Sequence, residues 1–208
     1  MEEDPAIALL RMLEAKDLDT GEHLRRLRHL VIPFGRKAGL PNERVCELIR
    51  FAWLHDIGKI GIREEIISKP GPLTPEELRE MREHSLIGYN ILRSLPSLSH
   101  IADWVLKHHE RWDGGGYPLG LKGEEIPFEC RLLAIADAYD AMTSDRPYRR
   151  ALGHRDALRE LQRCAGTQFD PKLVAVFCSI FVGERRGVVR YLSEARMRRA
   201  ALIESVVK

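Results

Sequence analysis

Five histidines and three aspartates interrupt or end apolar runs along this chain, and this pattern restricts the folds it can adopt. They are His23, His55, Asp56, His84, His108, His109, Asp137 and Asp140. An imidazole or carboxylate that points into a core is costly unless it is hydrogen-bonded, paired with an opposite charge or bound to metal. One such residue would mean little, but eight of them predict a fold that brings distant segments together around a shared polar site.

Nearly every segment between these residues has the apolar spacing of an amphipathic helix. The predicted helices cover residues 6–16, the segment around His23, residues 43–55, the segment from Pro75 that carries His84, residues 101–109 and 130–143, and two or three helices after Gly153. Thr74, Pro75 and Glu77 predict a helix start with a capping box. No alternating strand pattern competes, apart from one short β-hairpin near 118–126. We therefore predict an all-α fold, a single compact multi-helix domain.

The composition suits one domain and excludes several classes of protein. A chain of 208 residues can form one substantial core and is short for two. Lys and Arg total 33 against 31 Asp and Glu, a net charge of +2 that argues against a general nucleic-acid binder. The four cysteines lack CxxC spacing and look like small core residues in a reducing compartment. With no signal peptide and no apolar run of membrane-spanning length, we expect a cytoplasmic protein.

The residue types favour a cluster of two or more metal ions. His55 and Asp56 end an apolar helix just before Gly58, so both side chains can reach inward. Imidazole and carboxylate together suit Fe, Mn and similar first-row divalent ions. Adjacent helical residues such as His108 and His109 differ in direction by about 100°, so they can serve two metals that lie side by side.

Several strings in this sequence, in their order and spacing, resemble the HD-GYP family, a branch of the HD phosphohydrolase superfamily. They are Leu54-His-Asp-Ile-Gly-Lys-Ile-Gly61, Met81-Arg-Glu-His-Ser-Leu-Ile-Gly88, His108-His-Glu-Arg-Trp-Asp-Gly-Gly-Gly-Tyr-Pro118 and Ala136-Asp-Ala-Tyr-Asp-Ala-Met-Thr-Ser-Asp-Arg-Pro-Tyr-Arg149. The resemblance runs from about Asp17 to Phe177. We expect an N-terminal helix at 1–16, the catalytic domain at 17–180, and an Arg-rich helical tail packed on it at 181–208.

The resemblance implies a metal site. Its ligands would be His23, His55, Asp56, His84, His108, His109 and Asp137, with Asp56 bridging two ions. Spacing alone leaves Asp137 and Asp140 equivalent, and only the family pattern selects Asp137. Asp19 stands one helical turn before His23, where three-metal members have glutamate. It is expected either to hold a third ion or to cap the helix.

The resemblance also implies a substrate site. Lys59 would lie near the scissile phosphate, and Arg146 and Arg149 would hold the other phosphates or guanine edges. Tyr117, within the Gly-Tyr-Pro loop, would face the substrate. A solvated Lys59 and structural ion pairs for the two arginines are the alternatives.

The implied activity is hydrolysis of the bacterial messenger cyclic di-GMP to linear pGpG, and in some members on to GMP. Two or three divalent ions, Fe or Mn, would lower the pKa of a bridging water and stabilise the attacking and leaving oxygens. A catalytically weak nucleotide-binding module and an HD-type di-iron oxygenase compete, although the Gly-Tyr-Pro loop argues against both. A related cyclic dinucleotide as substrate, a homodimer, and an attached sensor or receiver domain stay open. No DNA or RNA polymer is expected as a partner.

Overall fold

A computed structural model describes residues 5–16, 20–145 and 150–182 of the protein. In these residues the regular structure consists of ten α-helices and two 3-10 turns, without a β-strand. None of the helices in the same ranges is long and apolar enough to cross a membrane. The predicted all-α fold is confirmed.

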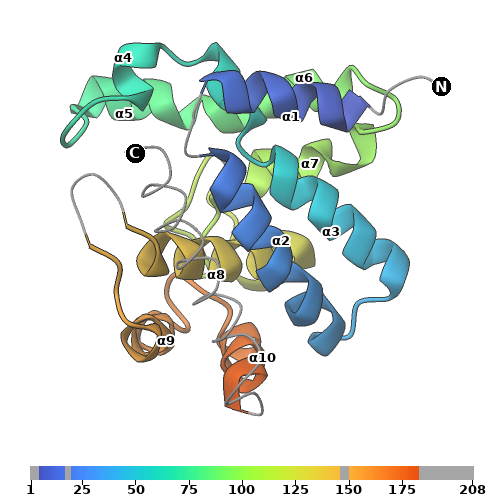
Figure 1. Ribbon diagram of the computed structural model, residues 1–208, viewed down its shortest axis with the longest axis vertical. Helices are drawn as coiled ribbons and strands as arrows, with labels where there is room; N and C mark the ends of the chain where they lie inside the picture. The colour runs from blue at the N-terminus through green and yellow to red at the C-terminus, as the bar shows by residue number, and fades with distance from the viewer. Residues whose placement is uncertain (1–4, 17–19, 146–149, 183–208) are drawn as a thin grey trace, which may run out of the picture.

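The helices that carry the candidate ligands pack against one another. The elements are α1 (Pro5–Lys16), α2 (Thr20–Lys37), α3 (Asn42–Leu54), η1 (Ile57–Gly61), α4 (Glu64–Ile67), α5 (Pro75–Arg82), α6 (His84–Arg93), α7 (Ser99–Lys107), η2 (Gly123–Glu125), α8 (Phe128–Thr143), α9 (His154–Arg163) and α10 (Pro171–Val182). Figure 1 shows α2 and α3 side by side, with α8 packed across α2. α1 and α6 lie at one end of this set, and α9 and α10 lie at the other.

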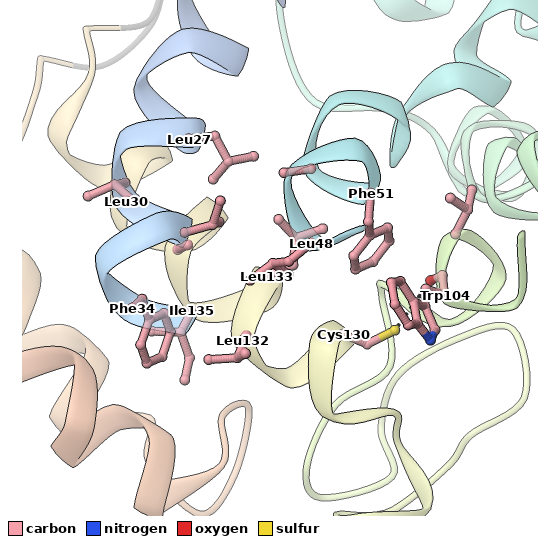
Figure 2. Packing of buried hydrophobic residues seen from close by; sticks show 14 of the residues in the cluster. Leu27, Leu30, Phe34, Leu48, Phe51, Trp104, Cys130, Leu132, Leu133 and Ile135 are labelled. Carbon is pink, nitrogen blue, oxygen red and sulfur yellow. Dashed lines mark hydrogen bonds between the residues drawn. The ribbon is translucent and has the colours of Figure 1, made fainter. Parts of the chain in front are cut away.

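The hydrophobic core fills the space between α2, α3 and α8. Leu27 from α2, Leu48 from α3 and Leu133 from α8 are fully or almost fully buried and lie close together in Figure 2. Phe51 extends this core to α7, because its ring meets Trp104 edge to face at 5.6 Å. Burial of these side chains stabilises the arrangement of the four helices. The core therefore fixes the helices from which the candidate ligands project.

Local signals in the sequence placed most of the helices. The capping box at the start of α5 is confirmed, because the Glu77 N–H donates to Thr74 Oγ1 at 3.3 Å and the Thr74 N–H donates to Glu77 Oε2 at 2.7 Å. α1 packs against α3 and η1 through the buried side chains of Ala6 and Leu13. Both features follow from short-range patterns of polar and apolar residues.

Two local expectations were wrong. α5 ends at Arg82, and His84 begins α6 instead of lying on the capped helix. The break leaves the last carbonyls of α5 without helical partners, and the ring of His84 uses one of them. Cys46, expected in the core, is exposed, because Val45 and Leu48 occupy the inner face of α3.

The hairpin expected at 118–126 was also wrong. This segment is a loop that contains the 3-10 turn η2. The buried carboxylate of Glu110 accepts backbone N–H groups from Leu119, Gly120 and Leu121 at 2.7, 3.2 and 3.0 Å. These donors are therefore withdrawn from strand pairing, which needs them for a ladder.

Candidate metal centre

His55 and Asp56 lie where α3 gives way to η1. α3 ends at Leu54, His55 keeps a helical backbone, and Asp56 precedes the 3-10 turn. Gly58 lets this turn pack directly on α6, because a Cβ atom there would lie only 1.8 Å from the carbonyl oxygen of His84. The close approach of the two backbones brings Asp56 next to His84.

Asp56 meets three histidines in the first of two groups of side chains that could hold a metal ion. This group, here the Asp56 group, contains Asp56, His84, His108 and His109, whose ligand atoms lie within 4.8 Å of one another. Oδ1 of Asp56 is 3.5 Å from Nε2 of His84 and 3.9 Å from Nε2 of His108. The two Nε2 atoms are 3.2 Å apart.

Hydrogen bonds to helix ends orient the histidines of this group. Nδ1 of His84 donates to the Met81 carbonyl, and Nδ1 of His108 donates to the Val105 carbonyl, both at 2.6 Å. Carbonyls in the last turn of a helix lack helical partners and are free for such bonds. With the proton on Nδ1, the two neutral rings present lone pairs at Nε2, and two lone pairs cannot hydrogen-bond to each other. A divalent cation beside Asp56 would satisfy both nitrogens, so the group fits a metal ion.

The second group, here the His23 group, contains His23, His55 and Asp137. Nε2 of His23 lies 3.5 Å from Oδ1 of Asp137, and Nδ1 of His55 donates to the Ala52 carbonyl at 2.9 Å. Asp56 connects the two groups, because its Oδ2 lies 3.4 Å from Nε2 of His55 while its Oδ1 faces the Asp56 group. A carboxylate in this position is suited to bridge two cations.

The ionisation states of the Asp56 group also suit a cation. Burial lowers the pKa of His84 and lowers the pKa of His109 to about 3. Burial, together with the adjacent His109, also holds the pKa of His108 well below its ordinary value. Burial would raise the pKa of Asp56, but Lys59 and the neighbouring imidazoles outweigh it and hold this pKa well below its ordinary value. The group thus presents neutral imidazoles and an ionised carboxylate, so no proton has to leave before a cation binds.

Lys59 is attached to the same site. Its Nζ donates to Oδ2 of Asp56 at 2.7 Å, and its side chain is 25% exposed. This contact argues against the alternative of a freely solvated lysine. The ammonium group is therefore held beside the candidate ligands and still reaches solvent.

Tyr117 forms part of the wall next to His109. The two rings stack with centroids 4.8 Å apart and an angle of 23° between their planes. The guanidinium of Arg82 lies 4.9 Å from the centre of the Tyr117 ring. Burial raises the pKa of Tyr117, so the phenol keeps its proton and can donate a hydrogen bond at neutral pH. Glu110 holds this loop in place through the backbone N–H groups described above.

The two aspartates that spacing left equivalent have different environments. Asp137 belongs to the His23 group, whereas the buried Asp140 accepts a hydrogen bond from Nδ1 of His23 at 2.7 Å. Burial would lower the pKa of His23, but the hydrogen bond to Asp140 and the charge of Asp137 raise it. Both carboxylates therefore face His23 from α8, and each contacts a different ring nitrogen.

The structure brings together all of the predicted site residues that it describes. His23, His55, Asp56, His84, His108, His109 and Asp137 form the two groups, and Lys59 and Tyr117 contact them. Asp19, Arg146 and Arg149 lie outside the described residues. Their expected roles stay predictions.

The sequence reasoning did not predict what three residues, Gly58, Glu110 and Asp140, contribute to the site. Gly58 and Glu110 stand inside the motif strings, two residues after Asp56 and one residue after His109, so their place in the motifs was an available signal. Asp140 follows Asp137 by three residues, a helical spacing that puts both on one side of α8. Spacing could not show what the second carboxylate contacts.

Comparison with known proteins identifies the family. A family model for the HD domain matches residues 8–173. A cyclic di-GMP phosphodiesterase of Thermotoga maritima is 42% identical over 177 residues, which cover 84% of this chain and 48% of that protein. A probable cyclic di-GMP phosphodiesterase of Vibrio cholerae is 36% identical over 193 residues, covering 85% of this chain and 44% of that protein. The chain thus spans about half the length of the curated relatives it matches.

A solved structure shares the fold. The cyclic GMP-AMP-specific phosphodiesterase V-cGAP3 of V. cholerae superposes with a TM-score of 0.67 at 21% identity, over 86% of this chain and 48% of that chain. At this identity the likeness concerns the fold alone. The chain therefore belongs to the HD domain family, as its HD-GYP motifs predicted.

Proposed function

We propose that this domain is a metal-dependent phosphodiesterase that opens cyclic di-GMP to linear pGpG. The observation that carries the proposal is the pair of Nε2 lone pairs of His84 and His108, which face each other at 3.2 Å beside Asp56. A buried arrangement of this kind is stabilised by a cation and not by a hydrogen bond. The similarity to proteins named as cyclic di-GMP phosphodiesterases supports the substrate.

The two groups would hold two ions. One would be held by Asp56, His84, His108 and His109, and the other by His23, His55 and Asp137, with Asp56 as the bridging carboxylate. Iron or manganese suits a donor set of imidazole and carboxylate without thiolate. When bound, such a pair lowers the pKa of water and offsets charge on the phosphoryl oxygens. A third ion at Asp19, with onward cleavage to GMP, stays a prediction.

Lys59 would stabilise the charge that develops on the phosphodiester. Its ammonium is preoriented by the 2.7 Å contact with Asp56 and is partly open to solvent, where a substrate phosphate can reach it. A positive charge fixed before the reaction stabilises a phosphoryl transition state more than a mobile one does. Asp56 and Lys59 are therefore the proposed catalytic residues.

Tyr117 would form the side of the substrate site next to His109. Its phenol keeps its proton, and the Arg82 guanidinium over its ring adds positive charge to the same wall. Such a wall suits an anionic substrate with aromatic bases, which can both stack and accept hydrogen bonds. Arg146 and Arg149 stay predicted contacts to phosphate or guanine.

The choice among cyclic dinucleotides, the location of the protein and its partners are further parts of the proposal. A related cyclic dinucleotide such as cyclic GMP-AMP is the alternative substrate, because a protein with this fold is described as specific for it. Location in the cytoplasm, control by an attached sensor or receiver domain, and homodimer formation stay predictions.

The test is product analysis on metal-reconstituted protein. The chain is freed of metal, loaded anaerobically with Fe(II) or Mn(II), and incubated with cyclic di-GMP, cyclic GMP-AMP or pGpG before chromatography. We expect pGpG from cyclic di-GMP. A metal-loaded protein that cleaves no cyclic dinucleotide would refute the proposal in favour of a binding module, and oxygen consumption would favour the oxygenase.

A matched pair of histidine variants distinguishes the effect of losing a site histidine from the effect of losing a histidine elsewhere. His108→Ala removes a buried residue of the Asp56 group and should abolish both metal retention and hydrolysis. His100→Ala removes an exposed histidine that is paired with Glu47 on α3, outside both groups, and should leave both unchanged. Equal activity in the two variants would contradict the assignment.

A further inference from the structure

A chain of three side chains links α2 to α8 behind the His23 group. Nδ1 of His23 donates to Oδ2 of Asp140 at 2.7 Å. Arg26 holds the same carboxylate, with Nε donating to Oδ1 at 2.6 Å and Nη2 donating to Oδ2 at 3.1 Å. Asp140 is only 3% exposed, so these contacts are largely shielded from solvent.

His23 differs from the other oriented histidines in where it lies. His55 and His108 follow the last residues of α3 and α7, where a free carbonyl three residues earlier accepts the Nδ1 proton. His23 lies inside α2, where the carbonyl three residues earlier belongs to the helical hydrogen-bond ladder. Its Nδ1 proton therefore needs an acceptor from another element.

We propose that Asp140 is a positioning residue that holds the proton of His23 on Nδ1 and keeps Nε2 free for metal, with Arg26 fixing the carboxylate. This inference rests on the metal site of the proposed function and not on the phosphodiester that is cleaved. The Nε2 atom of His23 already points to Asp137, the other ligand candidate, at 3.5 Å. Carboxylates that accept the second N–H of a metal-bound imidazole orient the ring and strengthen its donor nitrogen.

The spacing of both helices supports this role. His23 and Arg26 are three residues apart on α2, and Asp137 and Asp140 are three residues apart on α8. Residues at this spacing lie on one side of a helix, so two facing pairs can meet across the contact between α2 and α8. Each helix thus supplies one candidate ligand and one supporting residue: α2 supplies His23 and Arg26, and α8 supplies Asp137 and Asp140.

The chain offers a matched control for removing Asp140. Asp170 is also 3% exposed and is also paired with an arginine of another segment, through Nη1 of Arg131 at 2.7 Å, but neither belongs to a metal group. Asp140→Asn and Asp170→Asn thus each neutralise one buried carboxylate that is bound to arginine. Both should lower the melting temperature of the metal-free protein, because a partly buried arginine loses its charged partner.

Only Asp140→Asn should weaken metal binding. Titration of the metal-free full chain against a chelator of known affinity should show one of two ions bound about 10–100-fold more weakly than in the wild type, the usual cost of losing such a support. Asp170→Asn should bind both ions as the wild type does. If Asp140→Asn bound both ions with the affinities of Asp170→Asn, the inference would be overturned.

A measurement on the wild type keeps the inference testable if Asp140→Asn does not fold. Nitrogen-15 NMR of the metal-free protein, above the pKa of His23, should show the neutral ring protonated at Nδ1. A ring protonated at Nε2 would overturn the inference. Because metal affinity and tautomer are measured instead of turnover, a chain that shows both effects yet cleaves no dinucleotide refutes the proposed function alone.

Discussion

Gly58→Ala should separate η1 from α6 and thereby weaken metal binding by the Asp56 group. An added Cβ atom would lie 1.8 Å from the carbonyl oxygen of His84 and 2.6 Å from the backbone nitrogen of Gly88. Both neighbours are backbone atoms of a packed helix, so neither can rotate away. To restore the 3.0 Å that real Cβ contacts require, the two segments must move apart by about 1.2 Å.

A shift of this size is large for a metal site. The Asp56 carboxylate stands two residues before Gly58, and its Oδ1 lies 3.5 Å from Nε2 of His84. A misplacement of about 1 Å can lower the rate of a reaction on the order of 10²-fold where geometry must be held closely. We expect a loss of similar size in metal affinity. Overpacking of this kind also costs about 1–3 kcal/mol of stability, or roughly 2–12 °C in melting temperature for a chain of this size.

The assay is metal affinity by chelator competition, with calorimetric melting of the metal-free and metal-loaded protein. Gly61→Ala is the control, because it lies in the same 3-10 turn and faces the same helix, but the three atoms nearest its Cβ would be side-chain carbons of Ile87, at 3.0–3.7 Å. That side chain can move, so the control should bind metal normally. Equal metal affinity in the two variants would refute the reasoning.

Three further predictions concern charge. Lys59→Ala should leave metal content near normal and lower kcat on the order of 10²-fold, because it removes a fixed charge from the phosphoryl transition state; unchanged kinetics would contradict this role. Arg82→Met should raise KM for the cyclic dinucleotide by roughly threefold to tenfold with little change in kcat, whereas Arg79→Met, on the same helix but paired with Glu76, should change neither. The metal-free protein should lose stability as the pH falls from about 7 to about 4, because the three histidines of the Asp56 group have lowered pKa values and the unfolded chain binds their protons first, at up to about 1.4 kcal/mol per pH unit each. His23, whose pKa is raised, opposes this slope only above the ordinary histidine pKa of about 6.5. An equal melting temperature at pH 7 and pH 5 would contradict the prediction.

The sequence predicted well which side chains come together at the site. It predicted less well which residues hold those side chains in place. Polar residues at the ends of apolar helices can be recognised in the sequence, and the structure brings the seven expected ligands that it describes into two groups. The contact of Asp140 with His23 depends on the distance between α2 and α8, which no spacing within either helix encodes. The sequence could therefore predict that Asp140 faces the site, but it could not predict the role of Asp140.

Local competition for hydrogen bonds explains why the predicted hairpin at 118–126 and the predicted helix of His84 were wrong. The alternating pattern at 118–126 was compatible with a hairpin, but Glu110 from an earlier segment occupies three of its backbone donors. His84 followed the helical pattern of α5, but the chain breaks before it and frees a carbonyl for its ring. In both places a side chain took a backbone group that the periodic pattern had assigned to regular structure.

For the histidines at helix ends, the tautomer of the ring and the location of the ring are set by different parts of the structure. His55, His84 and His108 each carry the acceptor for Nδ1 three residues earlier in their own segment, so the tautomer of each ring is fixed wherever that segment is placed. Only the location of each segment depends on the packing of the helices. A shift of the helices relative to one another would therefore change the distance between the Asp56 group and the His23 group without altering which nitrogen each of these rings offers.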